Sequence, residues 1–325
     1  EIGTILTDSN RNKQSAINYV GGAAGELVII ERPKNVAVDK LWNTQTFDYD
    51  DIIYGSNGKD YISTGGGLDQ ITPGYGEDTV NGGPSIDWVN LENLKEPIFA
   101  TSSQSTNQGS PLNNIHVTNK NTSTDKIINS VLEEVESLTA FGPSSIDLRD
   151  LGKPNSIVFS NVSGELEGSY AVRSGSGSII SGSRYNDQFI ISLMANDNES
   201  GFDSVISLTD YTNQLNTTQV TSSDTNVSAD ESLNSDVSSA EVEMQSSTAE
   251  TDDTNNFQIL AQPSIIVGEG GRDKLTFAVP GTAERGLRIT EPMSIGEYKN
   301  FHAVVEDGII KALFKDIDVK QVDVI

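Results

Sequence analysis

The chain has 325 residues, with 47 acidic side chains against 21 basic ones, a formal net charge of −26 and a pI near 4.2. This balance argues against nucleic acid as a partner, because phosphate backbones are bound by basic surfaces. No run of 18 apolar residues is present, so the sequence predicts no membrane span. With no cysteine and two histidines, disulfides and soft-metal sites are excluded as well.

Residues 1–45 are expected to form an N-terminal capping β segment. One strand is predicted at 26–31, where Leu27, Val28, Ile29 and Ile30 precede Pro33. A second strand is predicted at 35–39. These strands would cover the open strand edges at the start of the next region.

Residues 46–94 contain a nine-residue repeat. Asp60, Asp69, Asp78 and Asp87 recur at this period, and each has Ile or Val two positions later. Gly58, Gly67 and Gly76 stand two positions before the first three, while Ser85 holds that place in the fourth unit. Asp51, followed by Ile52 and Ile53, forms a half repeat before them. Four consecutive matching units make this a specific signal.

The two halves of such a unit have different physics. The glycine half can turn tightly and aim carbonyl groups at one point, and the second half is a short strand with one inward apolar residue. If two units make one turn of a flattened coil, Asp60 and Asp78 line one edge, and Asp51, Asp69 and Asp87 line the other. Carboxylates stacked about 4.8 Å apart repel unless a cation lies between them. Calcium suits six or more oxygen ligands better than magnesium does.

This repeat resembles that of the RTX (repeats-in-toxin) family of secreted bacterial proteins. The resemblance implies a parallel β-roll with calcium-binding nonapeptide turns. It assigns the carboxylates of Asp60, Asp69, Asp78 and Asp87 as ligands, together with carbonyls around Gly58, Gly67, Gly76 and Gly83. Pro84 and Ser85 depart from the family pattern. The alternative is a calcium-free series of turns, but Gly and Asp turns do not by themselves recur every nine residues with an apolar partner.

Residues 95–207 are expected to continue as a β-solenoid. A polar loop is predicted at 101–114, and 125–138 fits either a helix or a strand at 135–138 that opens the solenoid. Short strands at 145–148, 156–159, 164–166, 170–172 and 178–180 favour the strand. This ladder resembles the β-solenoid regions of bacterial surface-layer proteins and RTX adhesins. It ends in degenerate repeats, where Asp187 and Asp203 are candidate calcium ligands.

The remaining chain divides at about residue 262. Residues 208–262 are rich in Ser, Thr, Asn, Asp and Glu, which predicts an acidic low-complexity linker or an exposed insertion. Residues 263–325 are expected to form a small C-terminal β module with one further repeat, in which Asp273 is a candidate ligand. The C-terminal stretch 322–325 resembles a type I secretion signal, or is an ordinary edge strand. The expected fold class is therefore all-β.

Catalysis is not supported by the sequence. His116 and His302 are isolated, Glu133 and Glu134 fit a solvated face, and no nucleophile elbow stands out. The leading hypothesis is a calcium-dependent structural protein at the extracellular surface of a bacterium, a surface-layer subunit or an adhesin segment, with self-assembly or a cell-surface glycan as its partner. The alternative is the accessory module of a secreted polysaccharide-modifying enzyme whose catalytic domain lies outside this chain. A pore-forming toxin fragment ranks last, since no membrane segment is present.

Overall fold

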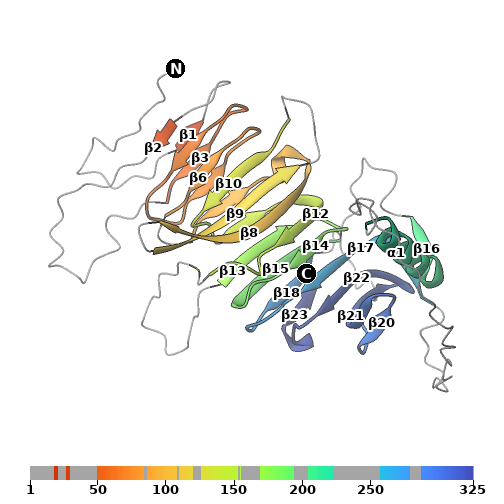
Figure 1. Ribbon diagram of the computed structural model, residues 1–325. Coiled ribbons are helices and arrows are strands. Elements are labelled where there is room, and N and C mark those ends of the chain that lie inside the picture. Colours follow the sequence, from red (N-terminus) through yellow and green to blue (C-terminus); the bar gives the residue numbers. More distant parts are fainter. Residues whose placement is uncertain are drawn as a thin grey trace, which may run out of the picture.

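The protein is all-β, with one α-helix among the residues that its computed structural model describes. These residues are 18–20, 27–29, 50–83, 86–107, 110–119, 126–152, 154, 169–193, 204–222, 257–278 and 287–324. Their strands form two sheets that lie face to face along most of the molecule (Figure 1).

The nine-stranded sheet contains parallel pairs only. Most of its strands have three residues, because each repeat provides one inward apolar side chain. Its strands, in spatial order, are β1 (Asn18–Val20), β3 (Ile52–Tyr54), β5 (Gln70–Thr72), β7 (Trp88–Asn90), β11 (Ser137–Thr139), β13 (Ser169–Ser174), β15 (Asn186–Ser192), β18 (Lys274–Ala278) and β23 (Val322–Val324).

The fourteen-stranded sheet mixes parallel and antiparallel pairs. From one edge its order is β2 (Leu27–Ile29), β4 (Tyr61–Ser63), β6 (Thr79–Asn81), β10 (Asn129–Glu133), β9 (Ser110–Asn119), β8 (Pro97–Asn107), β12 (Phe141–Asp147), β14 (Ile179–Ser181), β17 (Gln258–Val267), β22 (Ile309–Lys315), β21 (Tyr298–Glu306) and β19 (Arg288–Ile289). Two strands pair off this path, β16 (Val205–Ser207) with β17 and β20 (Met293–Ile295) with β21.

Successive short strands alternate between the two sheets. In the repeat region β3, β5 and β7 pair in one sheet, while β4 and β6 pair in the other, each strand aligned with the strand 18 residues later. Two nine-residue units therefore complete one circuit, as the period predicts. The predicted strand at 26–31 is present as β2, which pairs with β4. The predicted strands at 35–39, 156–159 and 164–166 lie outside the described residues.

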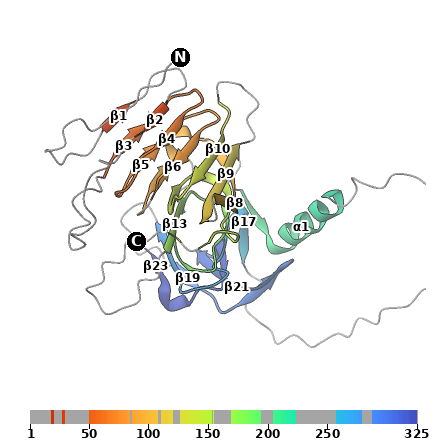
Figure 2. The same ribbon diagram turned by 60° about the vertical axis from the view of Figure 1, so that its left-hand side comes forward.

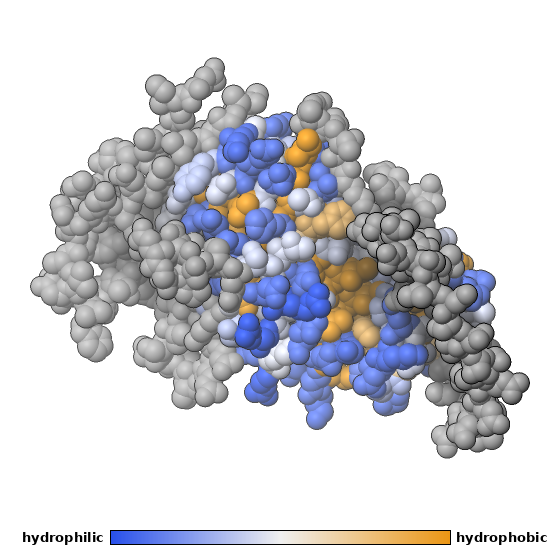
Figure 3. Space-filling model, in the orientation of Figure 1, coloured by the Kyte–Doolittle hydropathy of each residue, from blue (hydrophilic) through white to orange (hydrophobic). Residues whose placement is uncertain are grey.

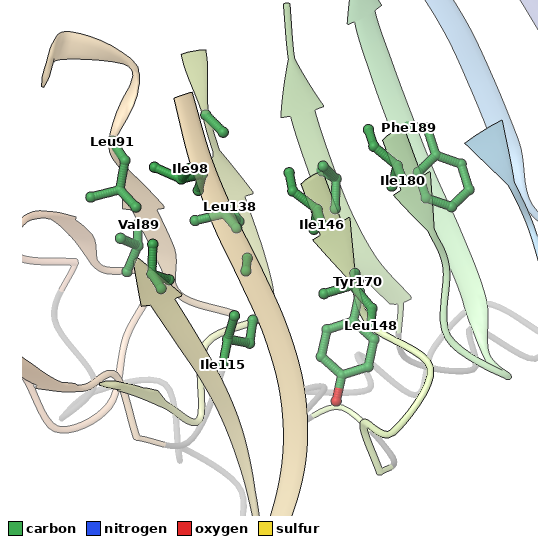
Figure 4. Packing of buried hydrophobic residues seen from close by; sticks show 14 of the residues in the cluster. Val89, Leu91, Ile98, Ile115, Leu138, Ile146, Leu148, Tyr170, Ile180 and Phe189 are labelled. Carbon is green, nitrogen blue, oxygen red and sulfur yellow. The ribbon is translucent and has the colours of Figure 1, made fainter. Parts of the chain in front are cut away.

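The main hydrophobic core is a narrow column between the sheets. Each repeat contributes one buried residue to it, and these are Ile53, Ile62, Ile71, Val80 and Val89. The column continues past the repeats, where Figure 4 shows Leu138, Ile146, Ile180 and Phe189 following Val89 from strand to strand. Because each strand needs to add only one buried residue to the column, a chain with few aromatic residues can still form a continuous core.

The segment 101–114 differs from its prediction as a polar loop. It belongs to the hairpin of β8 and β9, which pair antiparallel from Ile98–Asn119 to Asn107–Ser110. Ile98, Ala100, Ile115 and Val117 alternate inward at the base of this hairpin and are buried. Ser and Thr are compatible with the outward strand positions. The ambiguity at 125–138 resolves in favour of strands, because the described residues of this range contain β10 at Asn129–Glu133 and the start of β11 at Ser137, and no helix.

A second hydrophobic core lies at the C-terminal end. It joins α1 (Leu208–Ser222), β16, β17, β20, β21 and β22, with Tyr211, Ile259, Ile265, Phe301 and Leu313 among its buried residues. The predicted linker 208–262 is therefore structured at both ends, as α1 and as part of β17, while 223–256 lie outside the described residues. Figure 2 shows α1 standing off to one side of the sheets.

The strands of 263–325 pair with those of the preceding region. β17 pairs with β14, and β18 pairs with β15. The C-terminal stretch forms β23, a parallel edge strand beside β18. One face of the molecule is mostly hydrophilic, with hydrophobic residues grouped near its centre (Figure 3). Among the described residues, no helix has the length and apolar character to cross a membrane.

Candidate functional site

The repeat aspartates lie just before the strands, at the two edges where the chain passes between the sheets. We call Asp51, Asp69 and Asp87, with the residues aligned with them on the nine-stranded sheet, the first row. We call Asp60 and Asp78, with the residues aligned with them on the fourteen-stranded sheet, the second row. All five aspartates are buried.

Both rows are held by one repeated hydrogen bond. In the first row the main-chain N–H of Asp51 donates to Oδ1 of Asp69 at 2.8 Å, and that of Asp69 donates to Oδ1 of Asp87 at 3.1 Å. In the second row the N–H of Asp60 donates to Oδ1 of Asp78 at 2.9 Å. Each carboxylate thus accepts from the residue one circuit earlier, and the sequence prediction of which aspartates share an edge agrees with this placement.

The first row continues beyond the nonapeptides. The N–H of Asp87 donates to Oε2 of Glu136 at 3.1 Å. Farther along, Tyr170 is aligned with Asp187, and the N–H of Asp187 donates to Oδ1 of Asp273 at 2.9 Å. The candidate ligands Asp187 and Asp273 therefore lie in the first row, whereas Asp203 lies outside the described residues.

The glycines allow successive turns to touch. Gly67, Gly76 and Gly83 have φ values of 139°, 153° and 87°, which L side chains rarely adopt. A Cβ on Gly76 would lie 2.0 Å from the carbonyl oxygen of Gly58 in the turn below. Glycine is therefore required in this half of the unit, because the backbones of successive turns approach each other too closely for a side chain. Pro84 and Ser85, which depart from the pattern, lie outside the described residues.

Burial of these carboxylates raises their pKa values. Desolvation is the main cause for Asp78, Asp187 and Asp273, whose pKa values rise to about 7. The pKa of Asp87 rises to about 9, through desolvation and then the charges of Asp69 and Glu136. The pKa of Asp69 is raised as well, chiefly by desolvation. At neutral pH the metal-free rows therefore either hold protons or carry uncompensated charge.

Among the row aspartates that the structure describes, three keep a buried carboxylate oxygen with no hydrogen-bond partner, namely Oδ2 of Asp69, Asp87 and Asp273. At Asp273 this oxygen and a carbonyl oxygen both lie close to Gly268: the point where a Cβ on Gly268 would lie is 2.3 Å from Oδ2 and 2.5 Å from the oxygen of Asp316. Two acceptors that converge without a donor repel each other. This donor set of carboxylate and carbonyl oxygens fits a hard cation such as calcium.

In the loops that precede Asp60 and Asp187, a serine donates hydrogen bonds to the aspartate carboxylate. Oδ2 of Asp60 accepts from the N–H of Ser56 at 2.7 Å and from its hydroxyl at 3.1 Å. Oδ2 of Asp187 likewise accepts from the N–H of Ser183 at 2.6 Å. Asp60 and Asp187 thus accept hydrogen bonds from their own loops, and Oδ2 of Asp78 accepts from the hydroxyl of Ser130 at 3.3 Å, whereas Asp69, Asp87 and Asp273 keep a buried oxygen without a donor.

Beyond Asp78 the second row changes from aspartate to serine. The N–H of Asp78 donates to Oγ of Ser130 at 3.3 Å, and the N–H of Ser144 donates to Oγ of Ser178 at 3.0 Å. Ser264 accepts in the same way from the N–H of Gly177 at 3.0 Å. The Ser178 hydroxyl also donates to the carbonyl of Gly175 at 2.9 Å. A hydroxyl both accepts and donates, so this part of the row needs no cation.

The sequence analysis missed Glu136 and these serines, although a signal for them exists. Each stands two positions before an inward apolar residue, as the repeat aspartates do; the pairs are Ser130 and Leu132, Glu136 and Leu138, Ser144 and Ile146, Ser178 and Ile180, and Ser264 and Ile266. Beyond the repeats, the glycines and the nine-residue period are lost, but the polar residue still stands two positions before the inward apolar residue.

Two smaller expectations can be compared with the structure. The prediction of a solvated face at Glu133 and Glu134 is wrong for Glu134, which is buried and accepts from the N–H of Asn113 at 3.0 Å. Glu134 lies in a left-handed turn, with φ of 50°. His116 is exposed, and His302 stacks on Phe314 with ring centroids 5.2 Å apart.

In the described ranges no group of three or more His, Cys, Asp or Glu side chains is close enough to hold a metal by itself. Any cation in the rows must therefore take ligands in addition to these side chains, such as carbonyls of the turns. No protein-family model matches this chain, and no curated protein matches its sequence.

Proposed function

We propose that this chain is a calcium-dependent structural protein whose two rows form the edges of a parallel β-roll that continues as a β-solenoid. The supporting observation is the set of buried, unpartnered Oδ2 atoms on Asp69, Asp87 and Asp273. A carboxylate oxygen sequestered from water without a donor is strongly unfavourable unless a cation compensates it.

The residues of the two rows explain why the stacked state would depend on calcium. Without metal, the aligned carboxylates of the first row oppose ionisation of one another, which disfavours the stacked state at neutral pH. Calcium, when bound, supplies the compensating positive charge. The candidate ligands are the aspartates of the rows together with carbonyls of the turns at Gly58, Gly67, Gly76 and Gly83.

The proposed location is the extracellular surface of a bacterium, after secretion. Extracellular calcium modules have dissociation constants on the order of 0.1–1 mM, so such sites stay empty at cytosolic calcium levels. Each tenfold excess of calcium over its dissociation constant stabilises the folded state by about 1.4 kcal/mol per site. A surface-layer subunit or an adhesin segment is the role that fits an acidic β structure that folds where calcium is plentiful.

A calcium titration followed by circular dichroism and light scattering tests this proposal. We expect the β signal to rise with calcium and to be lost on chelation with EGTA. Growth of scattering after the β signal saturates would support self-assembly into a surface layer. An unchanged β spectrum across the titration, with no bound calcium, would contradict the proposal.

One observation favours the alternative of an accessory module that binds a polysaccharide. A groove of about 690 Å³ lies between the start of α1 and the β20–β21 region. Its lining includes the hydroxyl and amide side chains of Thr209, Thr212, Asn213, Ser294 and Asn300, which suit the hydroxyls of a sugar. Glycan-array binding that is lost in an Asn213→Ala, Asn300→Ala double variant would support this alternative; absence of binding by the native chain would exclude it.

A further inference from the structure

We propose that Glu136 completes a cation site with Asp87, using the carboxylates of both residues and the main-chain oxygen of Glu134. This site lies where the nonapeptide region joins the rest of the molecule, and it includes a residue that belongs to no nonapeptide. The inference rests on the proposed function, because it takes calcium as the cation.

The first argument is position. Ser137 pairs with Trp88, which places Glu136 beside Asp87 in the first row. Oε2 of Glu136 accepts the N–H of Asp87 at 3.1 Å, the same bond that Asp69 and Asp87 carboxylates accept from the circuits before them. Glu136 is 2% exposed. It therefore takes the place of the next aspartate, with a side chain one methylene longer.

The second argument is the unpartnered oxygen of Asp87. This side chain is 0% exposed, and its Oδ2 has no hydrogen-bond partner among the described residues. The point where a Cβ on Gly82 would lie is 2.5 Å from Oδ2 and 2.7 Å from the carbonyl oxygen of Glu134. Oδ2 and this carbonyl oxygen thus both lie close to Gly82, where a side chain would collide with them. A cation bound by both oxygens would compensate the unpartnered Oδ2.

The third argument is that the carbonyl of Glu134 is held in place. The N–H of Glu134 donates to the carbonyl of Asn113, and its side chain accepts the N–H of Asn113, both at 3.0 Å. The N–H of Gly82 donates to the carbonyl of Glu133 at 3.1 Å. These bonds fix the turn between β10 and β11 over Gly82, so the oxygen of Glu134 is positioned as a ligand before any cation arrives.

The test is the number of calcium ions bound to the full chain, measured by isothermal titration calorimetry. Glu136→Gln keeps an acceptor for the N–H of Asp87 and removes the charge, so we expect one ion fewer per chain and a smaller rise in melting temperature with calcium. In EGTA its melting temperature should equal or exceed that of the native chain. Glu133→Gln is the matched control, since Glu133 is half-buried and bonds the side chain of Asn81; its stoichiometry should be unchanged.

The outcomes separate the two proposals. If the native chain binds no calcium, the proposed function fails. If the native chain binds calcium and Glu136→Gln binds as many ions with the same affinity, the inference about Glu136 is overturned while the proposed function stands. Should Glu136→Gln not fold, Glu136→Asp keeps the charge but withdraws it by one methylene. We expect it to weaken calcium binding, and an unaltered affinity would overturn the inference.

Discussion

The main-chain N–H of Asp187 donates to Oδ1 of Asp273 at 2.9 Å, although 86 residues separate them. Asp51 and Asp69 form the same bond across 18 residues. The chain thus leaves the stack after β15, forms β16 and α1, and returns in register. The same bond is thus formed with or without a long intervening segment. This indicates that the fold maintains the row itself more than the local repeat.

We expect Asp273→Asn to stabilise the protein in the absence of calcium and to reduce the stabilisation that calcium provides. The new amide keeps an acceptor for the N–H of Asp187, and its Nδ2 can donate to the nearby carbonyl of Asp316. We expect a higher melting temperature in EGTA and a smaller gain on adding calcium. Asp307→Asn, at an exposed turn position, is the control and should change neither. A lower melting temperature in EGTA would contradict the assignment of Oδ2 as an unpartnered oxygen.

Stability of the metal-free chain should fall as pH rises. The pKa values of Asp78, Asp187 and Asp273 are about 7 in the folded state, against 3.8 for the unperturbed group. The folded state therefore holds protons that the unfolded state has released, so this stability is fully present below the unfolded pKa and is lost as pH rises through the folded pKa.

In EGTA, the free energy of unfolding should thus be higher at about pH 5 than at about pH 8, with a contribution of about 1.4 kcal/mol per pKa unit from each group. Urea unfolding at a series of pH values measures this. Saturating calcium should remove or reverse the trend. A metal-free protein that gains stability between these pH values would show that the carboxylates are compensated by other groups.

Ser178→Ala should destabilise the protein equally with and without calcium. It deprives the buried N–H of Ser144 of its acceptor and the carbonyl of Gly175 of a donor. An unsatisfied buried group costs about 1–3 kcal/mol. Ser181→Ala, at the far end of the strand that follows Ser178 and less buried, is the control. A loss that depends on calcium would mean that the serine part of the second row also holds cations.

Gly83→Ala should be far more damaging than Gly308→Ala. Both glycines have similar φ values, 87° and 80°, so the conformational penalty of about 1–2 kcal/mol is shared. A Cβ on Gly83 would lie 2.0 Å from the carbonyl oxygen of Gly65, whereas none of the described atoms lies within 4 Å of that point at Gly308. Melting temperatures of the two variants in calcium measure the difference. Equal losses would mean that the turns are not in contact.

The repeat region could be predicted from sequence in detail, because a strict nine-residue period specifies both the register of the strands and which side chains face inward. Nine residues with one apolar position specify the strand, and two units per circuit specify which aspartates align, as Asp60 and Asp78 do. This information ends at Asn90. Beyond it, only the offset between a polar residue and the apolar residue two positions later persists, which is too short a pattern to stand out from an ordinary strand.

Long-range pairing could not be predicted in the same way. The hairpin β8–β9 is polar over much of its length, so composition favoured a loop, whereas its pairing with β10 and β12 makes it a strand. α1 escaped prediction because its sequence lacks a strong apolar face, and the contacts of Leu208, Tyr211 and Leu215 with the second core support it. In both cases tertiary contacts decided a locally ambiguous segment.

The inserted hairpin lengthens one of the two sheets. Between β10 and β12 the larger sheet contains β9 and β8, while at the same level of the smaller sheet β13 follows β11 directly. One wall is thus longer than the other by two strand spacings, about 10 Å. We expect an insertion in one sheet alone to bend the stack at that level, and any lattice or filament built from this chain would repeat that bend.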